Sequence, residues 1–124
     1  MSREGLGTVL IVDDDHDLRD VLSEVLRDEG YGTASVSGGA EALAWLKGSL
    51  RPCIILLDLM MPGMDGWRFC AEQARDPAIR DIPVVVLSAD AGLEQKAGPL
   101  RAAGLLRKPV ALDRLLDVVR QARI

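Results

Sequence analysis

The sequence predicts an α/β domain: a doubly wound, five-stranded parallel sheet with helices on both faces. Two observations support this class. Short apolar runs alternate five times with stretches that have helical periodicity, which is typical of parallel sheets with crossover helices. In addition, two apolar runs end directly in carboxylates, at Asp13 and at Asp58. At 124 residues the chain fits one domain, and we expect residues 1–124 to form a single domain with nothing left over for a second one.

The first half of the chain supplies two strands, each followed by a helix. Residues Thr8 to Val12 are apolar and predict a strand buried on both faces. From Asp17, apolar residues recur at helical spacing, which predicts an amphipathic helix capped by Asp14 or Asp15 and ended by Gly30. The pattern then predicts a second strand over residues 32–36 and a second helix from Ser37-Gly38-Gly39 to Gly48.

The second half continues the alternation. Strands are predicted over residues 53–57, 84–88 and 105–107, the last being weak. A helix that Asp65 caps follows the third strand, and a final helix carries Leu112, Leu115, Leu116 and Val119. Between Asp90 and Ala103 a crossover helix is required, yet Gly92 and Gly98-Pro99 interrupt the pattern. We therefore expect a fourth helix that is short, kinked or displaced.

Polar residues of interest stand at the carboxyl ends of the predicted strands. They are Asp13 and Asp14 after the first strand, Asp58 after the third, Ser88 after the fourth and Lys108 after the fifth. In a parallel sheet these ends share one edge, so the five side chains should converge on one crevice. Crowded carboxylates need a cation, and oxygen ligands favour Mg²⁺. A metal, an ammonium and a hydroxyl around Asp58 would suit phosphoryl transfer with Asp58 as nucleophile.

Over essentially its whole length, the chain resembles the receiver domain of two-component response regulators. The residues that carry the resemblance are Asp13-Asp14, Asp58 within Asp-Leu-Met-Met-Pro-Gly-Met-Asp-Gly, Ser88-Ala89 and Lys108-Pro109. The resemblance implies a flavodoxin-like sheet of strand order 2-1-3-4-5 and a cis Lys108–Pro109 bond. It further implies that a sensor histidine kinase or a histidine phosphotransfer protein phosphorylates Asp58, and that a downstream protein reads the resulting change.

The same resemblance assigns a role to each site residue. Asp14 and Asp58, with the backbone carbonyl of Met60, would bind Mg²⁺ directly, and Asp13 would act mostly through metal-bound water. Lys108 and Ser88 would contact the phosphoryl oxygens, with Ser88 swinging inward on activation. The chain would be a signalling protein rather than an enzyme, assisting only its own phosphotransfer and slow autodephosphorylation.

Two features depart from the family pattern. The family often carries Tyr or Phe three residues before the lysine as a switch partner, and here that position is Leu105. The interval from Ser88 to Lys108 is also about two residues shorter than usual, and it contains Gly98-Pro99. These features motivate an alternative, a degenerate receiver-like module that binds a partner independently of phosphorylation. A third hypothesis, an aspartyl-phosphate phosphatase, is disfavoured because Met60 stands where such enzymes place a second Asp.

Composition limits the partners and the cellular location that we expect for the chain. The net charge of −4 and the lack of a long basic run argue against direct nucleic-acid binding by these residues. No apolar segment approaches membrane-spanning length, and the first residues lack the hydrophobic core of a signal peptide, so we expect no membrane partner and a cytoplasmic location. Cys53 and Cys70 fit buried thiols in a reducing compartment.

Overall fold

A computed structural model describes residues 6–48, 50–90, 92, 95, 100 and 102–123. Its centre is a five-stranded sheet of order β2-β1-β3-β4-β5 in which neighbouring strands are parallel. The predicted class and strand order are thus confirmed. The strands are β1 Thr8–Val12, β2 Gly32–Val36, β3 Ile54–Asp58, β4 Val84–Ser88 and β5 Gly104–Arg107.

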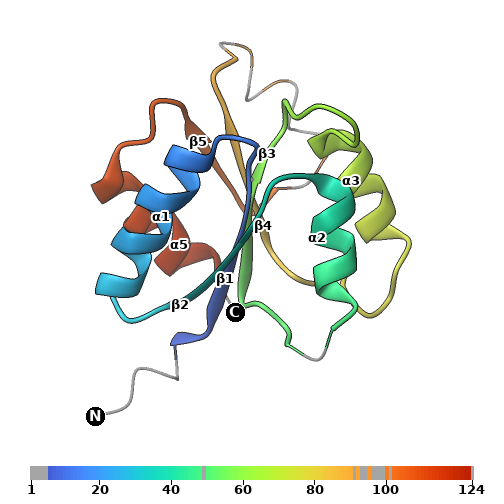
Figure 1. Cartoon of the computed structure of the whole chain (residues 1–124), viewed down its shortest axis with the longest axis horizontal. Coiled ribbons are helices and arrows are strands. Elements are labelled where there is room, and N and C mark those ends of the chain that lie inside the picture. Colours follow the sequence, from blue (N-terminus) through green and yellow to red (C-terminus); the bar gives the residue numbers. More distant parts are fainter. Residues whose placement is uncertain are drawn as a thin grey trace.

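Helices cover both faces of this sheet. In Figure 1, α1 and α5 lie on one side and α2 and α3 on the other. Each face has its own apolar cluster, so the sheet is the middle layer of three. The described helices are α1 His16–Asp28, α2 Gly39–Leu46, α3 Gly66–Ala74 and α5 Leu112–Ala122. Among the residues described here, no helix is long and apolar enough to cross a membrane.

The three central strands are apolar because both of their faces are covered. Along β1, Val9 and Ile11 join the cluster under α1 and α5, while Leu10 and Val12 join the cluster under α2 and α3. All four are fully buried, as the continuous apolar run predicted. The edge strands β2 and β5 are only partly buried. Within a central strand a carboxylate would be buried on all sides, so in these strands a charged side chain can meet a cation or solvent only at the strand's end.

Several element ends differ from the sequence prediction by a residue. β3 begins at Ile54 and includes Asp58 as its last residue, so the acceptor candidate lies within the sheet rather than just after it. α1 begins at His16, and of the two predicted caps it is Asp15 whose side chain accepts a hydrogen bond from the Leu18 N–H. Gly30 follows α1 with φ of 104°, and Asp65 caps α3, as predicted. The helix predicted around Gly98-Pro99 lies outside the described residues.

Candidate metal centre

The predicted site residues meet at the carboxyl edge of the sheet. Asp13 follows the last residue of β1, Asp58 and Ser88 end β3 and β4, and Lys108 follows β5. The strand register places Asp58 beside Leu87 of β4. An open crevice of about 610 Å³ lies over this edge, and Asp14, Asp58, Met60, Asp90 and Lys108 are among its lining residues.

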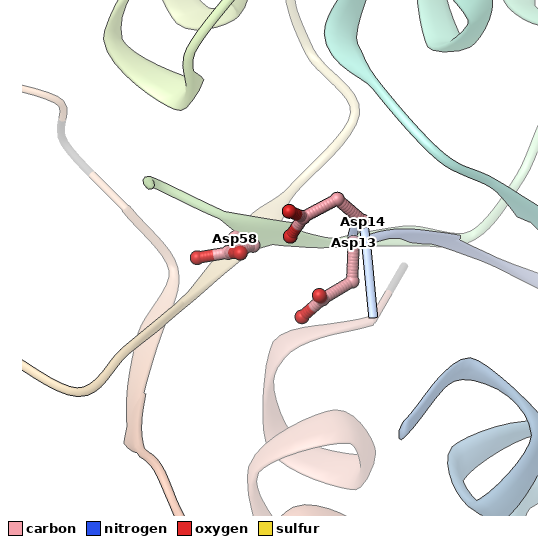
Figure 2. A group of neighbouring side chains, drawn as sticks. All are labelled: Asp13, Asp14 and Asp58. Carbon is pink, nitrogen blue, oxygen red and sulfur yellow. The ribbon is translucent and has the colours of Figure 1, made fainter. Parts of the chain in front are cut away.

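Three carboxylates gather at this crevice: Asp14 and Asp58 line it, and Asp13 lies buried beside them. One oxygen each of Asp13, Asp14 and Asp58 lies within 4.8 Å of the others. Figure 2 shows these side chains gathered where β1 and β3 end. Asp13 is fully buried, Asp58 is 3 % exposed, and Asp14 is exposed to solvent. Negative charge at two buried positions is costly unless it is neutralised, so the cluster requires a cation.

Lys108 supplies one positive charge to the cluster. Its Nζ lies 2.8 Å from Asp13 Oδ2 and 3.3 Å from Asp58 Oδ2. The Lys108 N–H donates to the Ser88 carbonyl at 3.0 Å, which joins this residue to the end of β4, and the Lys108–Pro109 peptide bond is cis, as predicted. One ammonium therefore bridges carboxylates from two neighbouring strands.

Main-chain N–H groups hold the other oxygens of the two buried carboxylates. Asp13 Oδ1 accepts from the Asp15 N–H at 2.9 Å, and Asp58 Oδ1 accepts from the Met60 N–H at 3.0 Å. Both donors lie two residues after their acceptor, in the turn that leaves the strand. Each carboxylate is thus oriented by its own turn, with Oδ2 directed toward Lys108.

The surroundings shift two pKa values in the site. Burial raises the pKa of the Asp58 carboxyl, and the charge of Asp13 raises it further; the Met60 N–H and Lys108 lower it, but the balance stays above the ordinary value. Burial alone would lower the pKa of Lys108, yet its contacts with Asp13 and Asp58 raise it above its ordinary value. Lys108 therefore keeps its positive charge, whereas the negative charge of Asp58 is not fully offset by the positive charge and the hydrogen-bond donor around it.

The residues fit a hard divalent cation. The donor set consists of oxygens, which Mg²⁺ prefers. The buried Oδ2 of Asp13 accepts no well-directed hydrogen bond from the described residues, although the ammonium lies beside it. Three carboxylates against one ammonium also leave a net negative charge, which a divalent ion would neutralise.

Ser88 is less well placed than the other four predicted residues. Its side chain is 1 % exposed, and its hydroxyl accepts a hydrogen bond from the Asp90 N–H at 3.1 Å. No hydrogen bond to Asp58 or Lys108 is formed by this hydroxyl within the described part of the chain. The structure thus brings together Asp13, Asp14, Asp58 and Lys108 and leaves Ser88 at the adjacent strand end.

Leu105 lies in β5, two strands from the acceptor. It pairs in register with Val86 of β4 and packs, half-buried, against the cluster under α2 and α3. Because side chains alternate along a strand, Val86 and Ser88 are successive residues of one face. Leu105 therefore lies beside the strand that carries Ser88.

One contact of the site was not anticipated from the sequence. Arg19, on the first turn of α1, donates from Nη1 to the main-chain carbonyl of Asp13 at 2.8 Å. An arginine in an amphipathic helix normally indicates only an exposed face, so no sequence signal identified it. The contact depends on how α1 folds back over the end of β1.

Comparison with known proteins identifies relatives of the chain. A family model described as the response regulator receiver domain matches residues 9–120. The DNA-binding response regulator MtrA of Mycolicibacterium smegmatis is 43 % identical over 81 residues, which cover 65 % of this chain and 34 % of MtrA. The response regulator MprA of Mycobacterium sp. strain KMS is 36 % identical over 114 residues, 90 % of this chain and 48 % of MprA.

The chain thus spans less than half the length of these curated relatives. Since MtrA is named a DNA-binding protein and matches over about a third of its length, the absence of nucleic-acid binding by the present residues stays a prediction. The assignment of residues 1–124 to a single domain likewise stays a prediction.

Solved structures agree with the sequence relatives. The chemotaxis protein CheY4 of Vibrio cholerae superimposes with a TM-score of 0.85 at 29 % identity, covering 94 % of this chain and 98 % of that one. A signal receiver domain of a histidine kinase from Syntrophus aciditrophicus gives a TM-score of 0.83 at 32 % identity, covering 92 % and 87 %. The structural similarity to these receiver-type proteins therefore extends over nearly the whole chain.

Proposed function

This chain belongs to the response regulator receiver domain family, and from that premise we propose that Asp58 is its phosphoacceptor in a Mg²⁺-dependent phosphotransfer. The donor would be a sensor histidine kinase or a histidine phosphotransfer protein. The observation that carries the proposal is the bridge from Lys108 Nζ to Asp13 at 2.8 Å and to Asp58 at 3.3 Å, inside a cluster of three carboxylates.

The carboxylates of Asp13, Asp14 and Asp58 would hold the metal together with the backbone carbonyl of Met60. When bound, Mg²⁺ supplies positive charge that neutralises the carboxylates and the phosphoryl oxygens. The fit rests on the all-oxygen donor set and on Oδ2 of Asp13, which is buried and accepts no well-directed hydrogen bond from the described residues although the Lys108 ammonium lies beside it. Asp14, which is exposed in the crevice, would reach the ion from the solvent side.

In the transfer itself, a carboxylate oxygen of Asp58 forms a bond to phosphorus. The bond between phosphorus and the donor imidazole nitrogen breaks, and its electron pair stays on the imidazole, which takes up a proton on leaving. The Met60 N–H holds Asp58 Oδ1, so the carboxylate is oriented before the donor arrives. Lys108 would follow the developing charge on the phosphoryl oxygens.

Ser88 and Leu105 would convert the phosphorylation of Asp58 into a change at the protein surface. In our proposal the Ser88 hydroxyl leaves the Asp90 N–H and turns to a phosphoryl oxygen, and Leu105 repacks beside β4 where the family often has an aromatic side chain. A downstream protein would recognise the changed surface. The alternative of a module that acts independently of phosphorylation is not favoured, because the acceptor, the acidic cluster and the lysine are all in place.

The proposed role is that of a signalling protein that assists its own phosphorylation and the slow hydrolysis of its aspartyl phosphate, not of an enzyme with separate substrates. A cytoplasmic location belongs to the same proposal, since the thiols of Cys53 and Cys70 are free and suit a reducing compartment.

The test is to incubate the purified chain with acetyl phosphate and Mg²⁺ and to measure the intact mass. We expect a gain of one phosphate, which is lost in EDTA and in Asp58→Asn. Asp65→Asn is the matched control: it removes a carboxylate from the same loop, while the amide oxygen can still cap α3. A wild-type protein that gains no phosphate in excess Mg²⁺ would refute the proposal.

A further inference from the structure

We infer that Arg19 is a positioning residue for the metal centre and that it acts by fixing the main chain of the β1–α1 turn. The inference rests on the proposed function, since it concerns the residues that would hold Mg²⁺. Arg19 Nη1 donates to the Asp13 carbonyl oxygen at 2.8 Å. A guanidinium donating to a main-chain oxygen makes a charge-assisted hydrogen bond, stronger than a neutral one.

The position of this carbonyl gives the contact its importance. β1 ends at Val12 and α1 begins at His16, so Asp13 lies between the two elements. Its N–H donates to the Val36 carbonyl at 3.2 Å, which ties the amide side of the residue to β2. On the other side of the residue, the guanidinium of Arg19 holds the Asp13 carbonyl by a hydrogen bond. Together the two contacts hold Asp13 at both ends of its backbone.

Fixing the Asp13 carbonyl also places Asp14. The atoms from the Asp13 Cα to the Asp14 Cα lie in one plane, because the peptide bond between them is rigid. A hydrogen bond to the oxygen of that plane therefore sets its rotation and the point from which the Asp14 side chain leaves the chain. Asp14 is the exposed member of the cluster and lacks the burial that holds Asp13 and Asp58.

Arg19 and Lys108 therefore act on different groups of the metal centre. Lys108 contacts the carboxylates of Asp13 and Asp58 and neutralises charge. Arg19 contacts a main-chain oxygen and fixes geometry. Its own backbone is anchored, because the Arg19 N–H donates to the Asp15 carbonyl at 3.0 Å in the first turn of α1.

The helix offers a matched control for this contact. Arg27, in the last turn of α1, donates from Nε to the Ser23 carbonyl at 3.3 Å, far along the helix from the metal centre. Arg19→Met and Arg27→Met each remove one guanidinium that donates to a main-chain oxygen and keep most of the apolar stem. Arg19→Lys restores a charged donor at the critical position.

Mg²⁺ affinity is measured by isothermal titration calorimetry without any phosphoryl donor, and stability by urea denaturation in EDTA. We expect Arg19→Met to raise the dissociation constant about tenfold, the lower range for a charge-assisted hydrogen bond. Arg27→Met should change it less than twofold, and Arg19→Lys should recover part of the loss. The two methionine variants should lose similar stability in EDTA.

Unchanged Mg²⁺ affinity in Arg19→Met, an equal loss in Arg27→Met, or no recovery in Arg19→Lys would overturn the inference. If Arg19→Met does not fold, Arg19→Lys decides: a dissociation constant above that of wild type but less than about tenfold above it is expected, and an unchanged one would overturn the inference. A wild-type protein that binds no Mg²⁺ would instead count against the proposed function, so the two failures are distinguishable.

Discussion

Replacement of Lys108 by methionine tests how strongly one ammonium stabilises two buried carboxylates. At an effective dielectric constant of about 20, attractions at 2.8 and 3.3 Å are each on the order of 5–6 kcal/mol before desolvation is subtracted. Removing one partner of a buried pair costs roughly 3–5 kcal/mol, because the remaining charge is left uncompensated. The Lys108 side chain is 23 % exposed, so water replaces part of it. We therefore expect a loss of about 3 kcal/mol.

The assay is urea denaturation followed by circular dichroism at pH 7 in EDTA, with linear extrapolation to water. Lys47→Met is the control, because Lys47 is an exposed lysine beyond α2 and should change stability by no more than about 0.5 kcal/mol. Added Mg²⁺ should restore part of the loss in Lys108→Met, since a divalent ion can neutralise the same carboxylates.

A double variant adds a second check. Asp58→Asn removes one of the two carboxylates that Lys108 neutralises, so Lys108→Met should cost less in the Asp58→Asn background than in wild type. A loss below about 1 kcal/mol for Lys108→Met, or an equal loss in both backgrounds, would refute the reasoning, because the ion pairs would then contribute little to the metal-free fold.

Three further predictions concern single side chains. Because the pKa of Asp58 is raised in the folded state, its ionisation costs stability above that pKa; metal-free wild type should therefore gain stability as pH falls from 7 toward about 4, and Asp58→Asn, measured by urea denaturation at each pH, should gain less. Gln73→Leu removes two buried hydrogen bonds, to the Ile79 and Ile82 carbonyls, and should cost about 2 kcal/mol while calorimetric Mg²⁺ affinity stays unchanged; weakened Mg²⁺ binding would contradict this. Asp15→Ala should cost about 1 kcal/mol in thermal or urea unfolding through loss of the α1 cap, and an unchanged stability would show that the cap is dispensable.

Local patterns in the chain were enough to predict the strands and helices that the structure describes. The central strands are continuous apolar runs because both faces are covered, and this run length distinguishes them from the helices with their 3.6-residue period. The predicted starts of β3 and α1 were each wrong by one residue, since the structure begins them at Ile54 and His16. Hydrogen bonds to neighbouring segments decide such ends. Asp58 therefore proved to be the last residue of β3, where the sheet still orients it.

The acidic cluster and its lysine were also predictable, because the carboxyl ends of parallel strands meet at one edge whatever lies between them. Ser88 shows the limit of this argument. It stands at the predicted strand end, but its hydroxyl accepts from Asp90, since the orientation of a single side chain depends on the local turn. Arg19 is a residue that the sequence argument missed, because nothing in a helical pattern indicates which main-chain oxygen an arginine will reach.

The order of residues along the chain was sufficient to predict that Asp13, Asp14, Asp58 and Lys108 lie together, since strand ends and carboxylates are local features that one parallel topology brings together. The tertiary structure alone decided that Lys108 bridges Asp13 and Asp58, that Oδ2 of Asp13 lacks a well-directed hydrogen bond, and that Arg19 holds the carbonyl before Asp14. The physical reason is that these contacts form only when the strands assemble into one sheet and α1 packs onto it, and this assembly depends on residues far apart in the sequence.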